Sequence, residues 1–206
     1  MIDGMKGLYR PLLIPSIRIR TIMSKPIYLD YNASTPIATE VVEAIRPYLE
    51  GFIGNPSSQH WAGIPYKKAV AEARAKVADL LGCSAGEVTF TSGGSEANNM
   101  AIKGAFFANS HKGKHLILSS IEHPSVFGPC EYLRKFGANI TYVPVDRTGT
   151  VDPDEVWKAI TDETILISIM HANNEIGTVQ PIEEIARVAR SREVIFHVDA
   201  AQSAGY

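Results

Sequence analysis

Residues 164–199 read TILISIMHANNEIGTVQPIEEIARVARSREVIFHVD, and this stretch decides the fold class. Its two ends, 164–170 and 194–199, are nearly continuous apolar runs, which is typical of strands that are buried on both faces of a sheet. The segment between them, 181–191, alternates apolar and charged residues at helical spacing. A strand, a helix and a second strand in this order predict an α/β fold whose parallel sheet is flanked by helices.

The same alternation extends along the rest of the chain. We predict further strands at 26–31, 87–91, 115–120 and 139–145, and further helices at 39–49, 66–82, 95–108, 125–136 and 152–160. The helix at 66–82 should have one apolar face, formed by Val70, Ala73, Val77, Leu80 and Leu81. Gly82 should end that helix.

Composition and charge limit the class of partner. The chain has 206 residues, 45% of them hydrophobic, and a formal net charge of -2, which suits one sizeable core and one domain. No basic run beyond the N-terminus points to nucleic acid, and no stretch approaches the roughly 18 apolar residues of a membrane span. We therefore expect a small-molecule partner.

The two cysteines, Cys83 and Cys130, are far apart and belong to no Cys-x-x-Cys pair. Neither a disulfide framework nor a metal site is indicated, and we expect two buried thiols. This usage favours a reducing compartment and hence a cytoplasmic protein.

Residues 1–26 differ from the remainder because they are rich in Arg and Lys, contain one acid, and are interrupted by prolines. Two interpretations stay open. The segment is an organelle transit peptide, which would make the protein mitochondrial, or it results from an upstream start codon, since Met23 lies just before the first predicted strand; the true start could be Met1, Met5 or Met23. In either case the domain should begin at residue 27.

Ligands of such sheets bind beyond the carboxyl ends of the strands, so the residues after each strand are the candidate site. After 87–91 the sequence TSGGSEANN gives two glycines and a helix start. The backbone N–H groups of Gly94 and Ser95 could cradle a phosphate there. The alternative is a tight turn capped by Ser92 or Ser95. The dinucleotide and P-loop glycine patterns are absent, so a nucleotide is the less favoured phosphate.

Two further strand ends carry polar side chains. His123 follows the strand at 115–120, where its imidazole could lie on a planar ligand or carry a proton; the alternative is a hydrogen bond within the loop. Asn174 follows the strand at 164–170, where its amide could donate to a phenolate oxygen; the alternative is a turn made by Asn173 and Asn174.

Asp199 ends the strand at 194–199, where an unpaired carboxylate would be costly to desolvate. A carboxylate in an apolar cleft can keep a pyridine nitrogen protonated, because each charge stabilises the other. Pyridoxal 5'-phosphate has a phosphate, a planar ring, a phenolic oxygen and a pyridine nitrogen. The four strand ends offer one partner for each, which makes this cofactor our prediction.

Six stretches, YLDYNASTP, GNPSSQH, FTSGGSEANNMAIKG, EHPSV, SIMHANNEIG and HVDAAQSAG, together resemble a known family. From about Ile27 to Gly205 the chain is similar to the class V aminotransferase-like pyridoxal phosphate enzymes. The closest form is that of the cysteine desulfurases of the NifS and IscS type and the related selenocysteine lyases. The resemblance implies the large domain of the aspartate aminotransferase-like transferases of fold type I.

The resemblance also implies roles for individual residues. Gly94 and Ser95 would bind the phosphate, and His123 would stack on the ring and act in catalysis by carrying protons. Asn174 and Gln202 would contact the oxygen side of the cofactor and the substrate, and Asp199 would pair with the pyridine nitrogen. The implied reaction converts L-cysteine, or L-selenocysteine in the lyases, to L-alanine. The implied partners are a sulfur-acceptor protein and a second copy of the chain.

The chain departs from the family at its C-terminal end. The family's Schiff-base lysine lies within a Ser-x-His-Lys type stretch beyond the position of Tyr206, and its persulfide cysteine comes later still. We therefore expect residues 27–206 to be the N-terminal part of a truncated large domain without the small domain, inactive alone as an enzyme. The alternatives are a natural, catalytically inactive short form that binds a partner subunit, and a class V enzyme for another amino acid.

Overall fold

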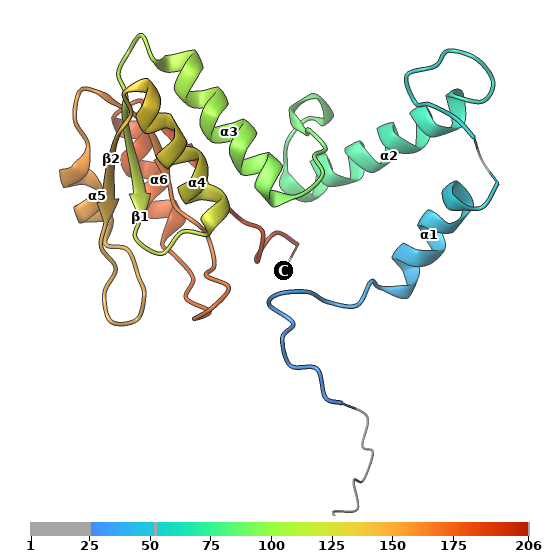
Figure 1. The fold of residues 1–206 in the computed structure, drawn as a ribbon, viewed down its shortest axis with the longest axis horizontal. Helices are drawn as coiled ribbons and strands as arrows, with labels where there is room; N and C mark the ends of the chain where they lie inside the picture. The colour runs from blue at the N-terminus through green and yellow to red at the C-terminus, as the bar shows by residue number, and fades with distance from the viewer. Residues whose placement is uncertain (1–25, 52, 206) are drawn as a thin grey trace, which may run out of the picture. The chain divides into compact units, whose positions relative to one another are not determined.

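The strands of the protein form a four-stranded sheet with helices packed beside it (Figure 1). The computed structural model describes residues 26–51 and 53–205. The strands are β1 (His115–Ser119), β2 (Asn139–Val143), β3 (Thr164–Ser168) and β4 (Ile195–His197). They lie in the order β2-β1-β3-β4 and all three pairings are parallel, which confirms the predicted sheet type.

Among the described residues, some helices precede the first strand and others connect successive strands. They are α1 (Thr39–Leu49), α2 (Ile64–Leu81), α3 (Gly94–Asn109), α4 (Pro124–Leu133), α5 (Pro153–Ala159) and α6 (Ile182–Ser191), with short 3-10 helices η1 (Ala85–Glu87) and η2 (Arg134–Phe136). Each predicted helix is present within a few residues of its expected bounds. Gly82 caps α2 with a left-handed backbone, φ 67°, as predicted. The predicted helix at 125–136 is divided between α4 and η2.

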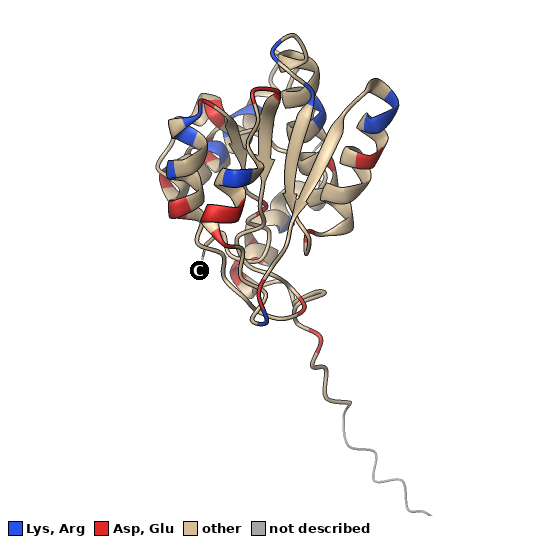
Figure 2. Ribbon diagram, turned by 90° about the vertical axis from the view of Figure 1, so that its left-hand side faces the viewer, with Lys and Arg blue, Asp and Glu red and all other residues tan. Residues whose placement is uncertain are grey.

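The strands bury both of their faces. Helices α3 and α4 cover one face, where Phe106 and Val126 pack against Leu116 and Leu118 of β1. Helices α5 and α6 cover the other face, where Ile117 of the same strand is buried. Because side chains alternate along a strand, a run such as LIL supplies both cores. Figure 2 shows that the charged residues lie on helices and loops, whereas the strands carry none.

Two predicted strands are wrong. Residues 26–31 and 87–91 form no strand, and Ile27 and Leu29 are each 83% exposed. A strand needs a neighbour for its backbone hydrogen bonds, and neither segment pairs with one in the described part of the chain. Residues 88–90 are held instead by Arg74, whose guanidinium donates to the Val88 carbonyl and lies 4.8 Å from the centre of the Phe90 ring.

The predicted apolar face of α2 is present in sequence but is not packed. Leu80 and Leu81 are more than half exposed, and Ala78 is the one buried residue among those of α2. Helix α1 has no buried residue. The core therefore comes from the segment between α3 and β4.

The chain divides by its internal contacts into two units, Met1–Tyr31 and Asn32–Tyr206. The predicted leader lies almost entirely outside the described residues, which begin at Pro26. No helix in the described ranges is long and apolar enough to cross a membrane. Those ranges also contain no cluster of three or more His, Cys, Asp or Glu side chains that could hold a metal ion.

Candidate functional site

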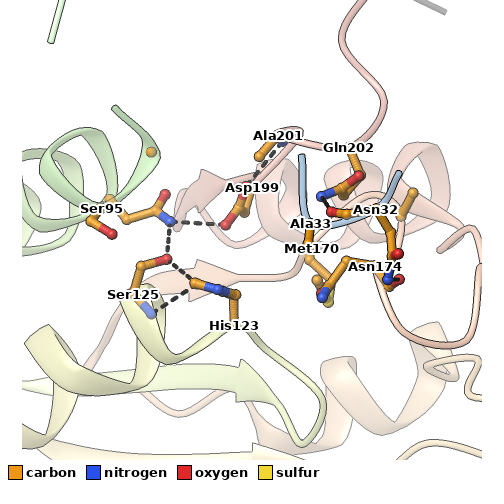
Figure 3. A pocket seen from close by; sticks show the side chains of 13 residues that line it. Asn32, Ala33, Ser95, His123, Ser125, Met170, Asn174, Asp199, Ala201 and Gln202 are labelled. Atoms are coloured by element: carbon orange, nitrogen blue, oxygen red, sulfur yellow. Dashed lines mark hydrogen bonds between the residues drawn. The ribbon is translucent and has the colours of Figure 1, made fainter. Parts of the chain in front are cut away.

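A cavity of about 450 Å³ lies at the carboxyl ends of the strands (Figure 3). Its size is within the range of small-molecule sites. All six residues predicted for the site line it, namely Gly94, Ser95, His123, Asn174, Asp199 and Gln202. Parallel strands end at one edge of the sheet, which brings His123, Asn174 and Asp199 together there, and the start of α3 adds Gly94 and Ser95.

Asp199 follows β4 and is fixed through both its backbone and its carboxylate. Its carbonyl accepts from the His171 N–H at 2.8 Å, which extends the pairing of β3 and β4 past their ends. Its Oδ1 accepts from the Ala201 N–H at 3.0 Å, and its Oδ2 accepts from the Asn98 side chain at 2.8 Å. A carboxylate has about four acceptor positions, so capacity remains for a ligand cation.

His123 is joined to Asp199 by two intervening side chains. The Asn98 amide nitrogen also donates to Ser125 Oγ at 2.9 Å, and Ser125 Oγ lies 2.7 Å from His123 Nδ1. The Ser125 N–H donates to the same ring nitrogen at 3.1 Å, so His123 also caps the N-terminus of α4. The hydrogen bond within the loop, predicted as the alternative to a functional role for His123, is therefore present. The ring also lines the cavity, so the two roles do not exclude each other.

The candidate phosphate cradle is the start of α3. The helix begins at Gly94, and the first N–H groups of a helix have no partner within it. A Cβ placed on Gly93 or Gly94 would meet no atom within 4 Å, so the space beside this turn is open. Ser92 donates through both its N–H and its hydroxyl to Glu96 at 2.6 Å. Those bonds lower the pKa of Glu96 and keep its carboxylate on Ser92.

The two asparagines of the 171–177 stretch have different tasks. Asn173 is buried, and its Oδ1 accepts from the N–H groups of Glu175 and Ile176, which makes the turn. Asn174 lines the cavity. The Asn174 carbonyl accepts from Asn32 at 2.9 Å, and the Asn32 carbonyl accepts from Gln202 at 3.2 Å. Asn32 is thus hydrogen-bonded to both Asn174 and Gln202.

Two titratable groups lie next to lining residues, Glu122 buried beside His123 and His197 half-buried before Asp199. Burial raises the pKa of Glu122 to about 7, although hydrogen bonds from Ser119 and from the Met170 N–H partly oppose that rise. Burial also lowers the pKa of His197, whose Nδ1 lies 2.8 Å from Ser168 Oγ. The sheet edge beneath the cavity is thus an environment in which charge is costly.

Covalent catalysts are not found among the lining residues. Within the described residues, no lysine and no cysteine lines the cavity. Cys130 is fully buried, and burial raises the pKa of its thiol to about 12, which keeps it an inert thiol as expected. Cys83 is half-buried, so the expectation of two buried thiols holds for Cys130 alone.

Several lining residues were missed by sequence reasoning, namely Asn32, Asn98, Ser125 and Met170. A signal for Asn98 existed. Positions 94, 98, 102 and 106 are spaced four apart along α3 and therefore share one face of the helix, and Ile102 and Phe106 are in the core. Asn98 lies on the same helix face as Gly94, which lines the cavity, and Ile102, which is in the core. A polar residue in that position must lie at the boundary between cavity and core.

The comparison with protein families identifies one match, the aminotransferase class-V model, over residues 27–206. Among curated relatives, the cysteine desulfurase IscS of Dictyoglomus turgidum is 53% identical over 184 residues, which is 89% of this chain and 47% of that protein. The cysteine desulfurase IscS of Methanosarcina thermophila is 52% identical over 183 residues, 89% of this chain and 45% of that protein. The chain thus spans about half the length of the curated relatives it matches.

Solved structures agree with this result. A structure of SspA in complex with cysteine matches with a TM-score of 0.82 and 44% identity, covering 85% of this chain and 51% of that chain. A NifS-like protein matches with a TM-score of 0.83 and 37% identity, covering 86% of this chain and 49% of that chain. The fold predicted from sequence is therefore confirmed as that of about half of these proteins.

Proposed function

The chain belongs to the class-V aminotransferase family, and from this we propose that it is part of a pyridoxal 5'-phosphate-dependent cysteine desulfurase. The observation that carries the proposal is the convergence of the six predicted residues on one cavity. The curated relatives are named cysteine desulfurases and one neighbouring structure contains cysteine, which favours L-cysteine over L-selenocysteine as the substrate.

The residues of the cavity fit the proposed cofactor. The N-terminus of α3 favours an anion, and the open space at Gly93 and Gly94 leaves room for a phosphate. Asp199 is a half-buried carboxylate with unused acceptor capacity, which suits a protonated pyridine nitrogen. Among the described residues, no lysine or arginine lines the cavity to compete for Asp199.

Each residue then has a defined task. Gly94 and Ser95 hold the phosphate, and Asp199 holds the ring nitrogen in its protonated form. His123 covers the ring and moves a proton, while Asn174 and Gln202 orient the oxygen side and the substrate. Pyridoxal phosphate, when bound, supplies the electron sink that lets bonds at the substrate's α-carbon break.

The reaction needs two covalent catalysts, a lysine for the cofactor and a cysteine for the sulfur, and neither lines the cavity in the part of the chain that the structure describes. We propose that the desulfurase activity belongs to the longer protein, together with its sulfur-acceptor protein and its pairing with a second copy. The cytoplasmic location expected from the thiols also stays a prediction.

Equilibrium dialysis of pyridoxal phosphate against the 206-residue chain tests the cofactor site. Ser95→Asp places a carboxylate in the phosphate cradle, so binding should weaken at least about tenfold through like-charge repulsion. Ser110→Asp, at the opposite and exposed end of α3, is the matched control and should bind as the wild type does. Equal binding by both variants would show that the phosphate does not bind at α3, and no binding by the wild type would remove the cofactor assignment.

A further inference from the structure

The state of Asp199 has a consequence for the proton on His123. A carboxylate only accepts hydrogen bonds, so the side chain that faces Asp199 Oδ2 must present a donor. Asn98 is 5% exposed, and its amide nitrogen lies 2.8 Å from Oδ2. The opposite orientation of the amide would set its oxygen against the carboxylate. The charge on Asp199 therefore fixes the orientation of the Asn98 amide.

That orientation determines what Ser125 can do. The amide nitrogen of Asn98 has two hydrogens; one goes to Asp199 and the other to Ser125 Oγ, 2.9 Å away. Ser125 Oγ thus accepts from Asn98. Its own single proton remains for His123 Nδ1, which lies at 2.7 Å (Figure 3).

His123 Nδ1 then receives two donors, the Ser125 hydroxyl and the Ser125 backbone N–H. A ring nitrogen that accepts a hydrogen bond cannot carry a proton, so the neutral imidazole must be protonated on Nε2. Within the described residues, no protein atom is hydrogen-bonded to His123 Nε2, and the ring lines the cavity.

We propose that Asn98 and Ser125 are positioning residues that transmit the ionised state of Asp199 to His123 and keep the imidazole proton on Nε2. Nε2 is then the atom through which His123 exchanges protons in the cavity. The assignment of a catalytic task to His123 rests on the proposed function, whereas the position of the proton rests on the hydrogen bonds alone.

The position of the proton can be measured without cofactor. Imidazole ¹⁵N chemical shifts of the histidine-labelled chain separate protonated from unprotonated ring nitrogens, and the His123→Gln spectrum identifies His123 among the six histidines. At a pH where the ring is neutral, two hydrogen bonds to Nδ1, each worth a factor of about five, should favour the Nε2–H form about twenty-five-fold.

Two variants interrupt the network at different points. Ser125→Ala removes the hydroxyl donor but keeps the backbone N–H, so the ratio of the two forms should fall about fivefold. Asn98→Leu removes the donor that directs the Ser125 hydroxyl proton toward Nδ1, so the hydroxyl can also turn and accept from Nδ1–H, and the ratio should fall by up to the same factor. Asn99→Leu is the matched control, because Asn99 donates to the Ser95 carbonyl within α3 and lies outside the network.

The possible outcomes are distinct. A proton on Nδ1 in the wild-type chain, or ratios in Ser125→Ala and Asn98→Leu that equal the control, would overturn the proposal. If far-UV circular dichroism shows that Asn98→Leu does not fold, Ser125→Ala decides alone. Absence of pyridoxal phosphate binding in a separate dialysis would count against the proposed function and leave the proton assignment standing.

Discussion

Glu122 should make the stability of the protein fall as pH rises from about 4.5 to about 7. Its side chain is 4% exposed; one carboxyl oxygen accepts from the Ser119 hydroxyl and, at 2.9 Å, from the Met170 N–H. The other oxygen is buried without a hydrogen-bond partner in the described part of the chain. A neutral carboxylic acid is far cheaper to bury there than a carboxylate.

The size of this loss in the free energy of unfolding follows from the change in the pKa of Glu122. Burial raises the pKa of Glu122 from 4.5 to about 7. The unfolded chain therefore releases this proton at a lower pH than the folded protein does, so stability present below pH 4.5 is lost as pH rises to 7. A rise of about 2.5 pKa units at about 1.36 kcal/mol each gives a loss of about 3 kcal/mol.

Glu122→Gln tests this, because glutamine has the same shape and does not titrate. Urea unfolding at several pH values between 4.5 and 8 should show a decline in the wild type that is absent from the variant. Glu163→Gln, at an exposed position, is the control and should keep the wild-type slope. Parallel curves for the wild type and Glu122→Gln would refute the assignment of the proton to Glu122.

Three further predictions concern activity and the core. The 206-residue chain alone should release alanine from L-cysteine no faster than free pyridoxal phosphate does, because no described lysine or cysteine lines the cavity; faster release would contradict this. In a chain completed with the C-terminal part of a relative, Asp199→Asn should keep the cofactor, measured by absorbance, and lose about a hundredfold or more in turnover. Retained turnover would show that Asp199 is only a strand-end acid. Phe106→Ala should lower the free energy of unfolding in urea by about 3–5 kcal/mol, and Phe107→Ala, at a position 49% exposed, by clearly less; equal losses would contradict the core described above.

The residues that follow the strands are the part of the site that could be predicted from the sequence. His123, Asn174 and Asp199 could be predicted because each follows an apolar strand, and the ends of parallel strands meet at one edge. Gly94 could be predicted from its two-glycine turn and the helix that begins there, although the run before it is not a strand. Asn98 could not be chosen that way, since it lies inside a helix. Its contact with Asp199, 101 positions further along the chain, exists only once α3 packs on the sheet.

The two wrongly predicted strands show what the sequence does not determine. Residues 26–31 and 87–91 have strand composition, yet they are not strands, because pairing depends on a neighbour that composition does not specify. The apolar face of α2 is a similar case: its periodicity predicts a helix and gives no information about what covers it.

The sequence by itself determined the α/β class, the parallel strands β1 to β4 and the residues at their ends, because apolar periodicity and turn residues are local properties of the chain. Only the tertiary structure decided the hydrogen-bond partners. It joined Asp199 to His123 through Asn98 and Ser125, and it buried Glu122 with one oxygen unpaired. Directional bonds and desolvation depend on distances between segments remote in sequence, and those distances arise when the helices pack on the sheet.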